Sequence, residues 1–374
     1  MDLVASRRYK NASLVVLVLL VFCVASRFLP QEQQTVSTIT NREAALVNAR
    51  LATVGGVIDF GPSGEIPVDY AKPIPTFSNI HVTSYKNTLP NPYVTSSENV
   101  TAYQQSILTF LHNPKSGGTT LKFCLQKLSR FLGKDNPLLV TPVSREATQT
   151  GFMNGVIKPE DHDIMMGGAS LGVCESFSSR RCSYFTIVRE PYDRMISHYF
   201  FCKEGGESSI SCDNKTIEEF AIDAGSIFFA QLALTVDCRC ENNCNDLSKQ
   251  PWHCSNDYKT YYANAEHKEE MLQYLVQHLD KYFAVIGLTE EYEVTLNLLQ
   301  HTFGLPFHDR CHETRQNAGS YGTQDKRELD EKKTEALKAM QASQRVKEIL
   351  HPDVVLYERA KEIYNIQKTK LFST

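Results

Sequence analysis

The sequence predicts an α/β fold in which helices flank a central parallel sheet. Two segments support this prediction, because each combines a short apolar run, a polar loop and a helical pattern. The apolar runs are Ile107–Leu111 and Tyr184–Val188, and both have the composition of a buried strand. Strands that alternate with helices are typical of parallel sheets. Residues 104–374 are numerous enough to form one large domain of this kind.

The first segment contains a candidate anion site. The turn signal Asn113-Pro114 follows the apolar run, and the loop Lys115–Thr120 then leads into a helical pattern. Loop amides, a lysine and the N-terminal end of a helix all favour phosphate or sulfate. In the common nucleotide-binding loop the lysine follows the second glycine, whereas Lys115 precedes both glycines. This order disfavours a kinase or GTPase of that class.

The second segment contains a second candidate phosphate site. Arg189 follows the apolar run, and Pro191 suits the first turn of a helix. An arginine forms forked hydrogen bonds to phosphate oxygens, and the hydroxyl of Ser197 can complete the shell. We expect Arg194, in the same helix, to form a structural ion pair rather than to bind a ligand.

These two segments resemble motifs of the sulfotransferases. The order P-K-x-G-[GT]-T is similar to their 5′-phosphosulfate loop, and R-[DE]-P-x-x-R-x-x-S-x-Y, which begins at Arg189, is similar to their 3′-phosphate motif. Phe283–Leu299, Asp353–Tyr364 and the loop 315–321 resemble, more weakly, segments of the Golgi-type carbohydrate sulfotransferases, including heparan sulfate O-sulfotransferase-like proteins. The resemblance extends from about Gln104 to the C-terminus. It implies a P-loop-like three-layer domain.

The resemblance also implies a reaction and the residues that carry it. The donor is 3′-phosphoadenosine 5′-phosphosulfate (PAPS), and the acceptor is a hydroxyl of a glycan such as a glycosaminoglycan. Lys115 is the expected catalytic residue, because it can stabilise or protonate the bridging oxygen. No metal is required, since lysine, arginine and helix dipoles meet the charge. The implied donor-binding residues are Lys115, Ser116, Gly117, Gly118, Thr119, Thr120, Arg189 and Ser197.

One position departs from the family pattern. Carbohydrate sulfotransferases carry a catalytic base in a G-H pair before the 3′-phosphate motif, and Gly168 occupies the place of that histidine. Glycine cannot accept a proton, so the base is left unassigned. The substitutes considered are His162, Glu175, His112 and His198. A PAPS-binding relative with little or no catalysis is therefore an alternative to an active enzyme.

Charge gives little information about the acceptor. The net charge of −4 is compatible with an acidic polysaccharide, because local basic patches can coexist with it. Protein tyrosine or a small alcohol are alternative acceptors, no nucleic-acid partner is expected, and the oligomeric state is open. Glu328–Val346 is rich in lysine and glutamate and predicts a solvated helix whose charges lie on the surface.

The N-terminus predicts a compartment for such an enzyme. Basic residues precede the apolar run Leu14–Ala25. We expect a cytosolic tail at 1–12, a signal-anchor transmembrane segment at 13–27 and a luminal stem at 28–103, as in a type II Golgi membrane protein. Secretion after signal cleavage is the alternative, because the run is short and ends in a sequence suited to cleavage.

The cysteines and sequons fit a luminal domain. The chain has 11 cysteines, and an even number remains after Cys23 of the apolar run is set aside. We expect a disulfide framework, including a Cys-rich elaboration at 203–262, where disulfides are favoured over a zinc site. The sequons at Asn99 and Asn214 predict glycosylation. The crowded cysteines of the elaboration are Cys238, Cys240, Cys244 and Cys254.

Overall fold

A computed structural model describes most of the predicted domain. The described residues are 105–131, 138–141, 151–152, 154–174, 178–206, 208, 210–236, 262–312 and 326–373. The predicted tail, anchor and stem lie outside these ranges, as do Glu175, Asn99, the loop 315–321 and the four crowded cysteines. None of the helices within the described ranges has a stretch long and apolar enough to cross a membrane.

A five-stranded parallel sheet forms the centre of the fold. Its strand order is β2-β3-β1-β4-β5, and every neighbouring pair is parallel. The strands are β1 (Ile107–Leu111), β2 (Leu139–Val140), β3 (Ile164–Gly167), β4 (Cys182–Val188) and β5 (Val285–Leu288). The two apolar runs of the sequence are therefore β1 and β4, which lie side by side. The prediction of an α/β fold with a central parallel sheet is confirmed.

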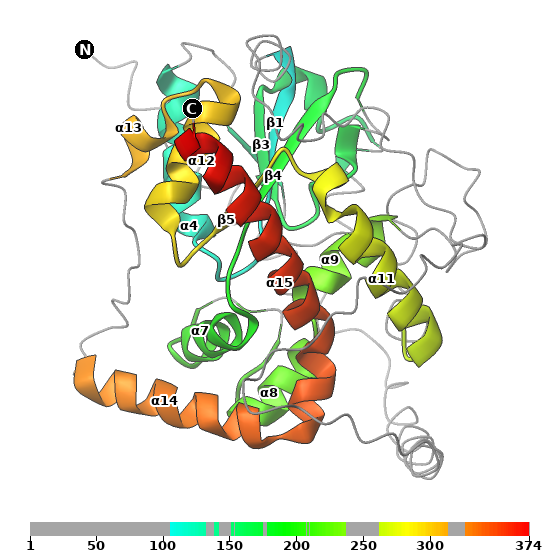
Figure 1. Ribbon diagram of the computed structural model, residues 1–374, viewed down its shortest axis with the longest axis vertical. Coiled ribbons are helices and arrows are strands. Elements are labelled where there is room, and N and C mark those ends of the chain that lie inside the picture. Colours follow the sequence, from blue (N-terminus) through cyan, green and yellow to red (C-terminus); the bar gives the residue numbers. More distant parts are fainter. Residues whose placement is uncertain are drawn as a thin grey trace, which may run out of the picture. The chain divides into compact units, whose positions relative to one another are not determined.

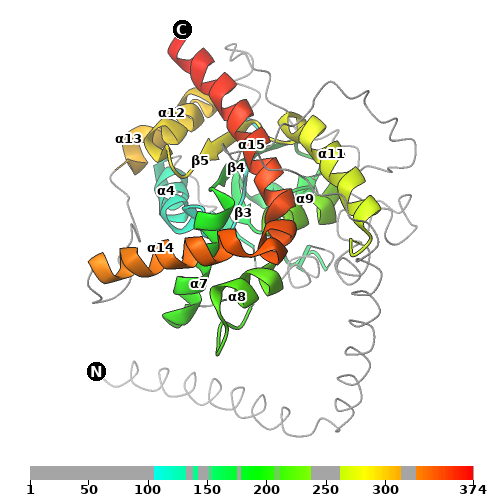
Figure 2. The same ribbon diagram turned by 60° about the horizontal axis from the view of Figure 1, so that its bottom comes forward.

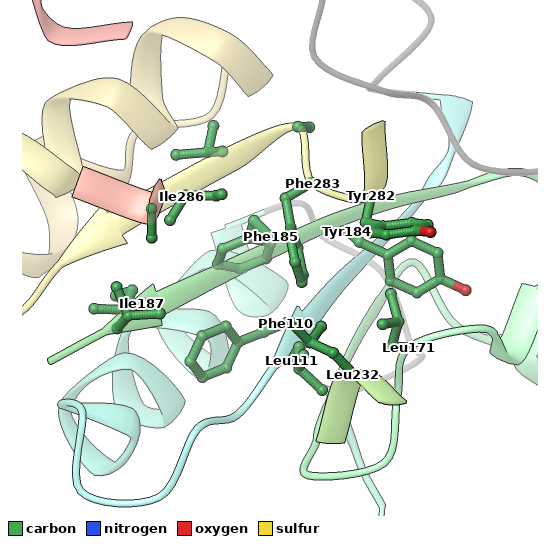
Figure 3. Close-up of a cluster of buried hydrophobic side chains, with 14 of the residues drawn as sticks. Phe110, Leu111, Leu171, Tyr184, Phe185, Ile187, Leu232, Tyr282, Phe283 and Ile286 are labelled. Carbon is green, nitrogen blue, oxygen red and sulfur yellow. The ribbon is translucent and has the colours of Figure 1, made fainter. Parts of the chain in front are cut away.

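Burial on both faces of the sheet is the reason that these strands are continuous apolar runs in the sequence. All residues of β1, β3, β4 and β5 are buried, as expected where helices cover both faces of a parallel sheet. Figure 3 shows Phe110 of β1, Phe185 of β4 and Phe283, which precedes β5, within one cluster. The rings of Phe110 and Phe185 have centroids 5.1 Å apart. Packing across β1 and β4 thus fixes the two strands whose loops carry the candidate motifs.

Helices cover the sheet on both sides. In both views, α4, α12 and α13 group on one side of the strands, and α9 and α11 group on the other (Figures 1 and 2). The long helix α15 packs against β5, α9 and α11. These helices are α4 (Gly118–Phe131), α9 (Ile227–Val236), α11 (Ala265–Tyr282), α12 (Tyr292–Phe303), α13 (Phe307–Cys311) and α15 (Gln344–Ser373).

A second apolar cluster lies apart from the main core. It joins α7 (Pro191–Lys203), α8 (Ile217–Ala224), α14 (Lys326–Ala342) and the first turns of α15. Figure 1 shows α7, α8 and α14 grouped beyond the end of the sheet. The helix predicted over Glu328–Val346 is divided, because α14 ends at Ala342 and α15 begins at Gln344. Buried members of the cluster include Met195, Ile196, Phe220, Met340 and Leu350.

Three disulfides join neighbouring elements in the described ranges. Cys124–Cys311 links α4 to α13, Cys174–Cys182 links the loop after β3 to β4, and Cys202–Cys212 links α7 to the segment before α8. The expected disulfide framework is therefore present for these six cysteines. The first and third of these disulfides hold α4 and α7, the helices that follow the two candidate loops.

Candidate active site

The loop after β1 turns sharply into α4. Lys115 has a φ of 66° and Gly117 has a φ of 79°, so both lie in the left-handed region. That region is uncommon for a residue with a side chain, and Lys115 is one of two such residues in the described ranges. The amide of Leu121 donates to the carbonyl of Gly117 at 3.0 Å, which begins the helix. Turns of this kind form concave groups of backbone amides that suit anions.

Among the described residues, two buried hydroxyls near this loop have no hydrogen-bond partner. The side chain of Ser116 is fully buried, and within the described part of the chain its Oγ makes no hydrogen bond. The same is true of the buried hydroxyl of Tyr292, whose ring lies 3.4 Å from a Cβ placed on Gly117. Burial raises the pKa of Tyr292, so its hydroxyl keeps its proton. Because buried polar groups are normally paired, the hydroxyl of Ser116 in this turn favours a ligand that accepts a hydrogen bond.

His112 packs against the start of α4, next to the loop. Its ring packs against Gly118, because a Cβ on that glycine would overlap the imidazole. It also stacks on Phe110, with centroids 5.8 Å apart. Burial lowers the pKa of His112 to about 4, and the charges of Lys115 and Lys122 act in the same direction. His112 is therefore a neutral packing residue in this structure, a poor base at neutral pH.

Lys115 reaches toward α7. Its Nζ lies 3.6 Å from the ring centroid of Phe201, a cation–π contact. Burial and the nearby charge of Arg189 lower the pKa of Lys115 to about 8, against the opposing effect of Glu204. The ammonium group is thus partly desolvated and remains largely protonated at neutral pH.

The loop after β4 meets the loop after β1. Nη1 of Arg189 donates to the carbonyl of Lys115 at 3.4 Å. The expected helix start is also present, because Pro191 begins α7 and the carboxylate of Glu190 accepts from the amide of Asp193 at 2.8 Å. The two candidate motifs lie together because β1 and β4 are adjacent and because Arg189 donates to the carbonyl of Lys115.

Arg189 and Ser197 share one pocket. Its volume is about 160 Å³, and residues of both α7 and α14 line it. Sequence reasoning placed the charges of α14 on the surface, so the contribution of Lys333 to this pocket was missed. The lining residues are Arg189, Asp193, Ile196, Ser197, Lys333, Thr334 and Leu337.

Arg194 points away from the pocket into the protein. Its Nη2 lies 3.2 Å from Oδ2 of Asp353, and both side chains are buried. The expected structural role of Arg194 agrees with this contact. The same contact gives a structural role to Asp353, which is the first residue of the segment that resembles the closing helix of the carbohydrate sulfotransferases.

Gln231 of α9 stands beside Gly168. A Cβ on Gly168 would lie 3.4 Å from Nε2 of Gln231. The same amide nitrogen donates to the carbonyl of His112 at 2.9 Å and to that of Gly168 at 3.0 Å. Gln231 therefore joins the ends of β1 and β3, in the direction that a side chain at position 168 takes. Gln231 is far in sequence from both motifs, so the sequence did not predict this role.

The two remaining histidine candidates do not provide a ready base. His162 precedes the N-terminal end of β3, whereas Gly168 follows its C-terminal end, so the two lie roughly 20 Å apart at about 3.3 Å per residue. His198 lies in α7, where its Nε2 is 3.1 Å from Oγ of Ser208 and its ring packs against Phe220. Burial and the charges of Arg194 and Lys115 lower the pKa of His198 to about 4. His162 is therefore far from Gly168, and His198 is near enough to Lys115 to feel its charge but contacts Ser208 and has a lowered pKa.

Comparison with known proteins agrees with this geometry. In the described ranges, no group of three or more histidine, cysteine, aspartate or glutamate side chains could hold a metal. No curated protein matches the chain. The sequence does match a family described as the sulfotransferase family over residues 100–359, which include both loops and the whole sheet. The chain belongs to the sulfotransferase family.

Proposed function

We propose that the protein transfers a sulfuryl group from PAPS to a hydroxyl of a glycan such as a glycosaminoglycan. The observation that carries this proposal is the meeting of two loops at adjacent strand ends. Arg189 donates to the carbonyl of Lys115 in the first loop and lines a pocket with Ser197. One donor with phosphates at both ends of its ribose fits across these two sites.

The first loop fits the 5′-phosphate of the donor. The hydroxyl of Ser116 has no partner among the described residues, and its amide donates to the carbonyl of Asn113 at 3.3 Å, which leaves the amides of Gly117 and Gly118, beside the start of α4, as the proposed donors to the anion. Thr119 and Thr120 in the first turn of α4 add hydroxyls to this set. Arg189 and Ser197 then hold the 3′-phosphate, which distinguishes PAPS from donors that resemble ATP.

Lys115 carries the proposed chemistry. Bound PAPS supplies an activated sulfuryl group, and transfer forms a bond from the acceptor oxygen to sulfur as the bond to the bridging oxygen breaks. The leaving group is adenosine 3′,5′-bisphosphate. With a pKa of about 8, Lys115 is charged at neutral pH and can stabilise or protonate that oxygen.

The acceptor proton requires a base. An amide cannot take this proton at neutral pH, so Gln231 does not replace the histidine that is missing at Gly168. Glu175, outside the described residues, is the remaining candidate after His162, His112 and His198. General base catalysis contributes roughly 10²–10⁴-fold, so we expect slow turnover if Glu175 is not the base. Gly168 has no base and its neighbour Gln231 cannot act as one, so this position also favours the second candidate function, a PAPS-binding protein without useful catalysis.

The proposed compartment is the Golgi lumen. Three disulfides in the described ranges support an oxidising environment. The basic residues before Leu14–Ala25 support an N-terminal membrane anchor with the catalytic domain in the lumen. Secretion after cleavage of that segment is the alternative.

An acceptor panel with labelled PAPS tests the proposed function. The purified full-length chain is assayed with desulfated glycosaminoglycans, a tyrosine peptide and a small alcohol, beside Lys115→Ala and Glu175→Gln. We expect label on a glycosaminoglycan, lost in Lys115→Ala. Label only on tyrosine or the alcohol contradicts the glycan acceptor, and PAPS binding without any transfer supports the non-catalytic alternative.

A further inference from the structure

We propose that Lys333 of α14 binds the 3′-phosphate of the donor and makes the site depend on that phosphate. This inference rests on the proposed function. Its starting point is the 160 Å³ pocket, which Lys333 lines together with Arg189 and Ser197. The residue after β4 and the helix α14 thus each supply a cation to the same pocket.

The charge of the pocket explains why a second cation is needed. Asp193 lines the same pocket and offsets the positive charge of Arg189. A phosphate monoester carries about −1.5 to −2 charges at neutral pH. With Lys333 the three side chains carry a net positive charge, which favours the phosphate. Arg189 alone leaves the pocket near neutrality.

The rotation of α14 is fixed by its apolar residues. Leu329, Ala336 and Met340 are buried, and the last two belong to the cluster with α7 and α8. Lys333 follows Leu329 by four residues and precedes Leu337, which also lines the pocket, by four residues. Lys333 is half-buried on this inward face, a position where an apolar residue is expected.

The neighbouring lysine provides a matched control. Lys332 is exposed, and its Nζ lies 2.6 Å from Oε1 of Glu328 on the outer face of α14. The two lysines are adjacent in sequence and differ in the face of the helix that they occupy. A general effect of removing positive charge from α14 is therefore the same for both, whereas a contact with the 3′-phosphate belongs to Lys333.

Calorimetry with two ligands tests this inference. The full-length chain, Lys333→Ala, Lys332→Ala and Lys333→Arg are titrated with adenosine 3′,5′-bisphosphate and with AMP, which lacks the 3′-phosphate. We expect Lys333→Ala to weaken binding of the bisphosphate by about tenfold or more, since a hydrogen bond to a charged group contributes about 1.5–3 kcal/mol. Binding of AMP should be unchanged, Lys332→Ala should match wild type, and Lys333→Arg should retain the preference.

The outcomes separate this inference from the proposed function. If the wild-type chain binds the bisphosphate and Lys333→Ala behaves like Lys332→Ala, the role of Lys333 is overturned and the donor site stands. Equal weakening of both ligands by Lys333→Ala also overturns it, because the effect is then not specific to the 3′-phosphate. If the folded wild-type chain does not bind the bisphosphate, the proposed function itself is overturned, together with this inference.

Discussion

Arg194 of α7 and Asp353 of α15 form a buried ion pair, with Nη2 and Oδ2 3.2 Å apart, although 159 positions separate them in the chain. The carboxylate of Asp353 also accepts from the amides of Phe228 at 3.3 Å and Phe229 at 2.8 Å, at the start of α9. One side chain therefore joins α7, α9 and α15. Because α7 carries Ser197 and α9 carries Gln231, this pair positions both helices that face the candidate site.

Breaking this pair should destabilise the protein strongly. Asp353→Ala leaves the buried charge of Arg194 uncompensated, and we expect a loss of about 3–5 kcal/mol in the free energy of unfolding. Urea denaturation measures this loss. The exposed pair Lys361–Glu358, with 2.8 Å between Nζ and Oε2, is the control, and Lys361→Ala should cost less than about 1 kcal/mol. Equal costs for the two variants contradict a stabilising role for Arg194–Asp353.

Lys115 should give the reaction an alkaline limit. Its pKa is lowered from the ordinary value to about 8, so the ammonium form is present below that pH and is lost as pH rises through it. If the charged form assists the leaving oxygen, kcat/KM falls above about pH 8, because kcat/KM reports the free enzyme.

Lys115→Arg is the informative variant for this limit. Arginine stays protonated, so the alkaline decline should move beyond the measured range while part of the activity remains. Lys115→Ala should lower kcat by about 10²–10³-fold. An unchanged decline near pH 8 in Lys115→Arg contradicts the assignment of this limit to Lys115.

Gly118 should not tolerate a side chain. A Cβ there overlaps the imidazole of His112, and overpacking of this kind costs about 1–3 kcal/mol. At Gly168 a Cβ makes an ordinary contact of 3.4 Å with Nε2 of Gln231, so Gly168→Ala should change stability little. Thermal denaturation of the two alanine variants provides the comparison. Equal stability of both variants would show that the ring of His112 moves aside without cost.

Asn214 should carry a glycan if the domain is luminal. It is exposed, with a φ of 54°, in the turn before α8. Thr216 of the same sequon is also the N-cap of α8, where its side chain accepts from the amide of Glu219 at 3.2 Å. Asn214→Gln should reduce the endoglycosidase-sensitive mobility shift by one glycan and leave the part due to Asn99, whereas Thr216→Ser should keep both the glycan and the cap. An unshifted wild-type chain contradicts glycosylation at this position.

Local patterns predicted the parts of the site that lie close together in sequence. The runs that became β1 and β4, the glycines after Lys115 and Pro191 at the start of α7 are all encoded within a few residues. Gln231, Tyr292 and Lys333 were not predicted as parts of the site. Their roles depend on packing between distant elements, which the sequence alone does not specify. Only the apolar stripe of α14 indicates which lysine faces inward.

The helix predicted over Glu328–Val346 illustrates a second limit. Its periodicity was sufficient to predict helical structure, but the break between α14 and α15 falls within it. The carbonyls of Ala339 and Met340 both accept from the amide of Ser343, each at 3.2 Å, which closes α14. Val346 then belongs to α15 and still packs in the same cluster as Met340. Two helices that bury their faces in one cluster resemble one continuous pattern in the sequence.

Calorimetric titration of the full-length, disulfide-intact chain with adenosine 3′,5′-bisphosphate tests the central claim most directly. We predict micromolar binding that is lost in Arg189→Ala, because Arg189 contacts the first loop and lines the pocket of the second motif. Lys361→Ala, on the outer surface, should bind as the wild type does. Absence of binding by the folded wild-type chain, or unchanged binding in Arg189→Ala, would contradict a donor site built across these two loops.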